Sequence, residues 1–247
     1  MDERREFSPV ILARIGGVLY LIIIALGLFG EAFVRDKLLV SGNAAATAEN
    51  IRSFEWLWRL GTAGNLVHLV CAVVLTLIFY ILFRVVSRDL ALLLVFFDLI
   101  SIGIEAASKL SLVAGLFPLS NAPYLKAFEP TQLHVLAYLA IREHGYGFGI
   151  SLIFFGCACL VVGYLIIRSG FLPKTIGVLM QIAGLCYLTN SFALLLNPEF
   201  ASRIFPAILV PAFIGEASLC LWLIAWGVNV EKWKQWAAPS GGSALAV

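Results

Sequence analysis

The chain has 247 residues, of which 61% are hydrophobic and only 13% are charged. Soluble domains average roughly 45–50% apolar and about 25% charged residues, and so few charges cannot cover the outside of a soluble fold. The net charge is only +2, and the basic residues form no block of the kind that binds nucleic acid. The composition therefore excludes soluble, disordered and nucleic-acid-binding proteins, and it predicts an integral membrane protein whose partners are membrane lipids.

Six stretches are long and apolar enough to cross a membrane, which takes about 20 residues. They lie at 10–33, 59–83, 90–116, 145–167, 174–196 and 206–229. We therefore predict an all-α fold, an integral membrane bundle of six transmembrane helices. Residues 1–237 form its single domain, and residues 238–247 form a disordered C-terminal tail because they are mostly small and uncharged.

Two of the longer connections resemble short helices that lie at the outer surface. Residues 44–58 begin with an alanine run and end in Phe54, Trp56 and Trp58, and residues 130–142 begin at Pro130. Aromatic side chains gather at headgroup depth, and proline is favoured at the first helical position. We predict two interfacial helices on the outer side; the alternative is that these residues extend the adjoining spans.

The orientation follows from the short basic connections. Arg84 and Arg88 lie between the second and third spans, and Arg168 and Lys174 lie between the fourth and fifth. Short loops rich in Lys and Arg stay in the cytoplasm. We therefore predict a multi-pass protein of the cell inner (plasma) membrane with both termini in the cytoplasm.

Several segments resemble the DUF4386 family of bacterial membrane proteins. These are residues 13–20 (ARIGGVLY), 44–51 (AAATAENI), 59–66 (RLGTAGNL), 163–165 (GYL), 168–173 (RSGFLP), 190–193 (NSFA) and 211–216 (PAFIGE). The family is defined by sequence and is of unknown function, so the resemblance implies no catalytic roles. Family members often have Asp where this chain has Asn65 and Asn190, and this departure argues against a role that needs an ionised group at these two positions.

Polar residues recur along the third span. Asp98, Ser101, Glu105 and Ser108 fall on one stripe at helical spacing, and this face should point into the bundle. Lys109 follows Glu105 by four residues, which is the favourable order for an ion pair within a helix. We predict that Glu105 and Lys109 form a structural ion pair, which by itself is weak evidence for any other role.

Three other spans carry polar groups. The second carries Asn65 and His68, three residues apart on one face, and the fifth carries Asn190. The sixth carries Glu216, which follows Pro211 and has no basic residue within a turn. We expect the proline to kink this helix. The partner of Glu216 must come from another helix, or the carboxyl stays protonated.

Charged groups inside a membrane are costly and persist where they pair, face the interior or act. We predict that Glu216, Glu105, His68, Asn65 and Asn190 bind a ligand in a polar pocket near mid-depth that opens outward. The alternative is that each finds a separate partner. The leading function is binding or transport of a small or amphiphilic ligand. A membrane-embedded enzyme acting on a lipid-like substrate and a passive accessory subunit are the alternatives.

A metal site has little support in the sequence. His68, Glu105 and Glu216 could supply three ligands, but no HExxH or CxxC motif accompanies them. We therefore predict no metal and no cofactor. His134 and His144 fall in the outer connection and are predicted to be surface groups.

A serine hydrolase needs a nucleophile, a base and an orienting group. Ser101 or Ser108 with His68 and Glu105 is one conceivable set, but the chain has no GxSxG motif. The sequence leaves catalytic residues unassigned.

Overall fold

The computed structural model describes residues 8–238, and most of them are helical, with no strand in this part of the chain. The predicted tail lies almost entirely outside the described residues. In chain order the elements are α1 (Pro9–Leu28), the π-helical η1 (Phe29–Arg35), α2 (Asp36–Leu38), α3 (Ala44–Ser53), α4 (Glu55–Phe83), α5 (Arg88–Ala114), η2 (Phe117–Leu119), η3 (Pro123–Ala127), α6 (Pro130–Ser169), α7 (Lys174–Leu196), α8 (Pro198–Ile204), η4 (Ala207–Leu209), α9 (Val210–Ala225) and α10 (Val230–Ala237).

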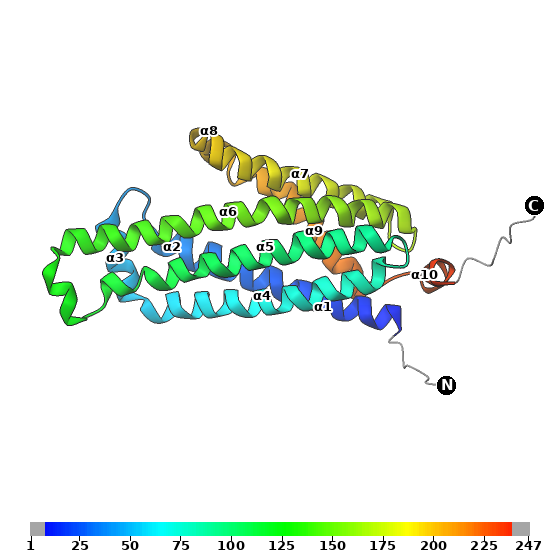
Figure 1. The fold of residues 1–247 in the computed structure, drawn as a ribbon, viewed down its shortest axis with the longest axis horizontal. Helices are drawn as coiled ribbons and strands as arrows, with labels where there is room; N and C mark the ends of the chain where they lie inside the picture. The colour runs from blue at the N-terminus through cyan, green and yellow to red at the C-terminus, as the bar shows by residue number, and fades with distance from the viewer. Residues whose placement is uncertain (1–7, 239–247) are drawn as a thin grey trace, which may run out of the picture.

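Six helical segments of the described chain have the length and apolarity of membrane spans. They are Pro9–Leu38, Glu55–Phe83, Arg88–Leu119, Pro130–Ser169, Lys174–Leu196 and Ala207–Ala225. The prediction of an all-α bundle with six spans is confirmed, and the protein is a polytopic membrane protein. The start of α1 lies at the same end of the bundle as α10 (Figure 1). We call this the proximal end, and the opposite end the distal end.

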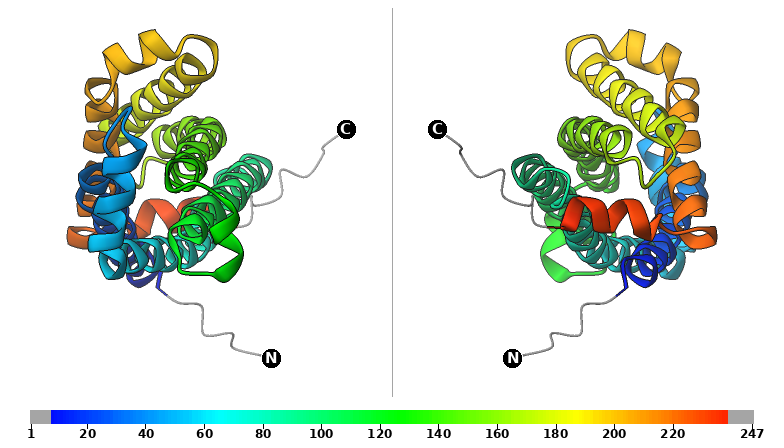
Figure 2. Two further views of the ribbon diagram at one scale, coloured as in Figure 1. Left: turned by 90° about the vertical axis from the view of Figure 1, so that its left-hand side faces the viewer. Right: turned by 90° about the vertical axis from the view of Figure 1, so that its right-hand side faces the viewer.

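The six long helices pack side by side in a closed order. α1 packs against α4, α4 against α5, α5 against α6, α6 against α7, α7 against α9, and α9 again against α1 (Figure 2). α6 and α7 approach most closely where their glycines meet. A Cβ atom placed on Gly163 would lie 2.6 Å from the carbonyl oxygen of Gly177. Small residues at such crossings let two membrane helices come into backbone contact.

α6 is one continuous helix of 40 residues, with a length of about 60 Å, or twice the hydrocarbon thickness of a bilayer. Gly149 packs against Leu194, close to the distal end of α7. The earlier residues of α6 therefore project beyond α7 at the distal end. Residues 130–142 begin this helix and form no separate interfacial helix there, so the alternative, extension of the adjoining span, describes them correctly. In the other connection, α3 is a short separate helix, and Trp56 and Trp58 belong to α4.

The last helices differ from the predicted kinked span. α9 begins at Val210, so Pro211 lies in the first turn, where a missing backbone N–H leaves no hydrogen bond unmade. The predicted kink is therefore wrong. Sequence analysis also missed α10, which lies across the proximal end. The indole N–H of Trp233 donates to the carbonyl oxygen of Leu82 (3.1 Å), and that of Trp236 donates to Ser169 (2.9 Å).

The buried apolar side chains form two clusters. The larger one, towards the proximal end, includes Leu75, Phe79, Phe83, Leu94, Cys159, Leu165, Phe171 and Leu223. The smaller one, at the distal end, contains Val34, Leu38, Ala48, Ile51, Trp58, Leu112, Leu116, Leu119, Ala137 and Ile141. Along α4, α5 and α6 a group of buried polar residues separates the two clusters. These polar residues form the candidate site.

Candidate functional site

Lys109 on α5 lies at the centre of this polar group. Its side chain is 2% exposed, and its Nζ atom lies 3.2 Å from the Oε1 atom of Glu105, one turn earlier on the same helix. The same Nζ lies 3.2 Å from Oε1 of Glu31, which comes from η1. Phe148 of α6 covers the ammonium group at 5.4 Å from the ring centroid. The structure thus brings Glu105 and Lys109 together, and Glu31 of η1 supplies a second carboxylate to Lys109.

Glu31 joins three cationic or titratable groups. It forms ion pairs with Arg35, one turn later, and with Lys109 of α5, and its carboxylate lies 3.3 Å from Nε2 of His144 on α6. We call Glu31, Arg35, Glu105, Ser108, Lys109 and His144 the distal network. Because these residues come from η1, α5 and α6, the network ties three helices together.

The local backbone explains why Glu31 and Arg35 face the network. Residues Phe29–Arg35 form a π-helix, and the backbone N–H of Asp36 donates to the carbonyl oxygen of Glu31, five residues back. π-helical turns are rare and are frequent at functional sites. The wider turn continues α1 towards the distal end.

His144 is completely buried, so its prediction as a surface group is wrong. Its Nδ1 lies 3.1 Å from Oγ of Ser108 and 3.3 Å from the carbonyl oxygen of the same residue. The reason is the continuity of α6, which carries position 144 along the face of α5. Close approach of the two helices continues at Gly147, where an added Cβ would lie 2.7 Å from Cβ of Ser108.

Ser108, His144 and Glu31 contact one another in the order found in a catalytic triad of serine, histidine and carboxylate. The Ser108 hydroxyl, however, donates to the carbonyl oxygen of Glu105 (2.7 Å) within its own helix. The backbone of α6 at Gly147 also packs closely against the Ser108 side chain, where an added Cβ would lie 2.7 Å from Cβ of Ser108. This geometry suits a series of structural hydrogen bonds. An activated serine nucleophile would need its hydroxyl to be directed at a base.

Asn65 and His68, the two predicted site residues on α4, face glycines of the α1 segment. A Cβ on Gly30 would lie 2.5 Å from Oδ1 of Asn65, and one on Gly27 would lie 3.8 Å from Nδ1 of His68. Neither side-chain atom has a hydrogen-bond partner among the described residues, and Nε of Arg35 has none either. A buried polar atom without a partner costs about 1–3 kcal/mol. Three such atoms therefore gather where α1, η1 and α4 meet.

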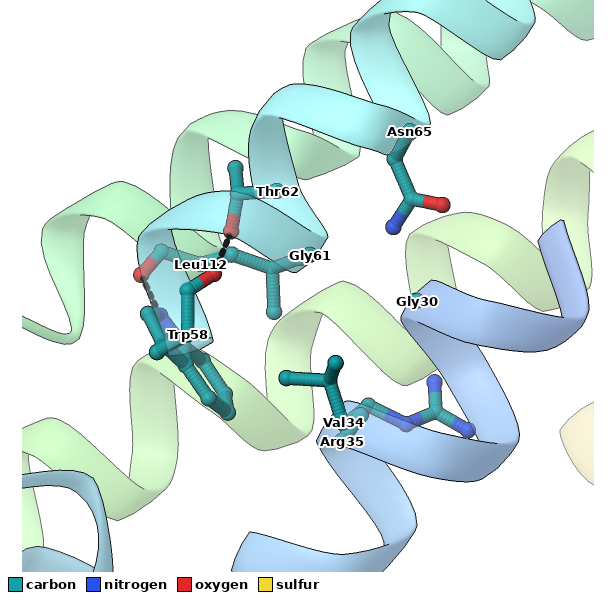
Figure 3. A pocket seen from close by; sticks show the side chains of 8 residues that line it. All are labelled: Gly30, Val34, Arg35, Trp58, Gly61, Thr62, Asn65 and Leu112. Carbon is teal, nitrogen blue, oxygen red and sulfur yellow. Dashed lines mark hydrogen bonds between the residues drawn. The ribbon is translucent and has the colours of Figure 1, made fainter. Parts of the chain in front are cut away.

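A small cavity lies beside two of these atoms. It has a volume of about 10 Å³. Its walls are Gly30, Val34, Arg35, Trp58, Gly61, Thr62, Asn65 and Leu112, and Figure 3 shows Asn65 directed from α4 towards Gly30. Such a volume holds about one water molecule when polar partners surround it. Of the five predicted ligand-binding residues, Asn65 is the one that lines this cavity.

Glu216 belongs to a separate polar centre. Its carboxylate accepts a hydrogen bond from the Tyr20 hydroxyl of α1 (3.2 Å) and another from the Tyr187 hydroxyl of α7. No ion pair reaches Glu216 among the described side chains. Asp98 of α5 accepts a hydrogen bond from Thr76 of α4. Among the described residues, no hydrogen bond or ion pair joins Glu216 to Glu105 or His68.

The two centres lie at different depths. Lys109 is 21 residues beyond Arg88, or roughly 32 Å along α5. Glu216 is 9 residues before Ala225, or roughly 14 Å from the proximal end of α9. With Arg88 and Ala225 taken as the proximal edge of a hydrocarbon core about 30 Å thick, the distal network falls near the distal edge and Glu216 near the middle.

The remaining predicted residue, Asn190, is buried on α7 and takes part in none of the bonds described for either centre. Among residues 8–238, no three His, Cys, Asp or Glu side chains are placed to hold a metal ion. The sequence analysis missed Glu31 and Arg35 as site residues and placed His144 at the surface. The one signal was the i, i+4 spacing of Glu31 and Arg35. It was overlooked because the predicted first span ended at residue 33, which placed Glu31 in the helix and Arg35 in the following loop.

The comparison with known families agrees with this architecture. A family model described as a domain of unknown function, DUF4386, matches residues 15–227, which is most of the chain. The chain belongs to the DUF4386 family. No curated protein and no solved structure matches it. The match spans all six helices of the DUF4386 bundle, including both polar centres, and the resemblance read from the sequence is confirmed.

Proposed function

We propose that this DUF4386 protein binds a small or amphiphilic ligand at the junction of α1, η1 and α4, beside the distal network. The observation that carries the proposal is the gathering of unpaired buried polar atoms from Arg35, Asn65 and His68. Groups that serve assembly alone are normally satisfied, and an unsatisfied group calls for a water, an ion or a functional partner. Asn65 and Arg35 already border a cavity that a ligand group could enlarge.

The depth of the site favours an amphiphile. The distal network lies near the edge of the hydrocarbon, so a polar head can reach it from the water while an apolar tail stays in the membrane. With both termini in the cytoplasm, which the basic short loops favour, this edge faces outward. Arg35 remains about one-fifth exposed and offers the route of entry. Passage of the ligand across the membrane, past Glu216, is the transport form of the same proposal.

Thiol labelling tests whether the site can be reached. In a variant without the native cysteines, Thr62→Cys places a thiol in the cavity wall, and a membrane-impermeant maleimide added to intact cells should label it. Thr76→Cys is the matched control, because Thr76 is 2% exposed on the same helix and lies towards the proximal end. If Thr62→Cys reacts no faster than Thr76→Cys, the site is sealed and the proposal fails.

Protection from labelling tests binding. The probes are a short-chain carboxylate, a short-chain alkylamine and a lysophospholipid, added to the Thr62→Cys protein in nanodiscs. At least one of them should slow labelling, and Asn65→Leu should abolish that protection while Asn190→Leu retains it. Labelling that none of the probes slows would indicate a passive accessory subunit, while chemical conversion of a protecting probe would indicate the enzyme.

A further inference from the structure

The hydrogen bonds around His144 can be assigned one hydrogen at a time. The Ser108 hydroxyl has one hydrogen, and its 2.7 Å contact with the carbonyl oxygen of Glu105 places that hydrogen between the two oxygens. Ser108 Oγ can then only accept from His144, and the Ser108 carbonyl oxygen can also only accept. Nδ1 of His144 lies 3.1 Å and 3.3 Å from these two acceptors. Nδ1 therefore carries a hydrogen.

The other ring nitrogen also faces an acceptor. Nε2 of His144 lies 3.3 Å from Oε1 of Glu31. Lys109 donates to this same oxygen, and Arg35 pairs with the other oxygen of the carboxylate, so two cations hold Glu31 in its ionised form. An ionised carboxylate accepts hydrogen bonds and cannot donate one. Nε2 must carry a hydrogen as well, and an imidazole with hydrogens on both nitrogens is an imidazolium.

We propose that His144 and Glu31 form a buried proton-binding site that links η1 to α6. Its ligand is one proton, carried on the imidazole of a completely buried side chain. When the proton leaves, a bare ring nitrogen faces a carboxylate, or the Ser108 hydroxyl must turn away from Glu105. The first change breaks the bond between η1 and α6. The second breaks the Ser108–Glu105 bond within α5 and leaves a neutral imidazole against Glu31, whose hydrogen bond is weaker than that of an imidazolium. In both cases the loss of the proton weakens the attachment of the π-helical segment to α6.

The groups that face this site come from every neighbouring element. η1 supplies Glu31 and Arg35, and α5 supplies Glu105, Ser108 and Lys109. α4 carries the nearby His68. The charged residues Glu49 and Arg52 of α3 are exposed, and Lys174 of α7 lies at the proximal end, away from the ring. Glu31 contacts the ring, and Lys109 contacts the same carboxylate oxygen of Glu31. The proton site involves none of the three unpaired atoms of the proposed ligand site and stands without it.

Nitrogen NMR can read the protonation state directly, because the chain has only three histidines. A variant with His68→Gln and His134→Gln, labelled with 15N-histidine and carried in nanodiscs, reports on His144 alone. At neutral pH we expect both ring nitrogens to be protonated, and Glu31→Gln in the same background to give a neutral ring. A neutral His144 in the parent, or an imidazolium that persists after Glu31→Gln, would overturn the proposal.

A second measurement uses the native histidines and does not depend on the double substitution. If the folded protein keeps a proton that the unfolded chain releases, stability must fall as pH rises. As the pH is raised, the melting temperature should therefore drop by more in the unsubstituted protein than in His144→Gln. His134→Gln is the matched control and should keep the drop. Equal pH profiles for all three proteins would refute the proton site.

Discussion

Removing the positive charge of Lys109 should lower the thermal stability of the protein, and one further substitution should restore most of the lost stability. Lys109→Met keeps the length of the side chain and deletes its charge. Within the described residues Lys109 is the one cation within 4.0 Å of Glu105, whereas Glu31 still has Arg35 and His144. The loss should therefore fall mainly on Glu105, whose carboxylate remains buried without a counter-charge.

Breaking a buried ion pair from one side costs about 3–5 kcal/mol in general. For a domain of this size, each kcal/mol shifts the melting temperature by roughly 2–4 °C, so a drop on the order of 10 °C is expected. Lys109→Met combined with Glu105→Gln removes both charges and should recover most of that loss. Glu105→Gln alone should be mild, because Lys109 keeps its contact with Glu31.

The chain supplies its own control for this experiment. Arg59 and Glu55 form an i, i+4 pair at 2.7 Å, but their side chains are 62% and 50% exposed. Exposed pairs contribute about 0–1 kcal/mol, so Arg59→Met should leave the melting temperature nearly unchanged. The assay is thermal unfolding in one detergent at one pH. A double variant less stable than Lys109→Met, or an equal loss in Arg59→Met, would refute the reasoning.

Three further outcomes are expected. Reporter fusions after Arg88 should read cytoplasmic and fusions at Ser120 external, and an external signal at Arg88 would reverse the assignment of the distal end to the outer side. Gly30→Ala should lower thermal stability by overpacking worth about 1–3 kcal/mol, whereas Gly27→Ala, with 3.8 Å of clearance, should match or exceed the parent. Glu216→Gln should leave probe protection at the cavity unchanged, because Glu216 bonds to Tyr20 and Tyr187 and is not among the cavity walls, and lost protection would contradict the separation of the two centres.

The fold was predictable because the membrane imposes a simple rule on sequence. Twenty or so apolar residues identify a span, and all six spans were found in this way. The ends of the helices were less predictable, because hydropathy cannot distinguish a helix that stops at the interface from one that continues. α6 continues, and its first residues carry enough polar groups to resemble a separate helix at the membrane surface. His144 was misplaced for this reason.

The site was predictable only within single helices. The spacing of Glu105 and Lys109 was visible in the sequence because an ion pair four residues apart is a local feature. The partners from other helices depend on how each helix is rotated, which no local pattern records. Glu31 reaches Lys109 through a π-helical turn, and the two hydroxyls that hold Glu216 come from residues 167 positions apart, Tyr20 and Tyr187.

The distal network and the neighbouring residues of α4 differ in the state of their hydrogen bonds. On the side formed by η1, α5 and α6, Lys109 and His144 each contact Glu31, at 3.2 Å and 3.3 Å. On the side formed by η1 and α4, Asn65 and His68 each retain an atom without a partner. A network that served assembly alone would be satisfied on both sides, because each open group weakens the fold. The paired side, around Glu31, holds η1, α5 and α6 together. The open side, at Asn65 and His68, is where a ligand can add hydrogen bonds without breaking any. Because η1 belongs to both sides, a ligand on the open side acts on the same segment that the proton site attaches to α6.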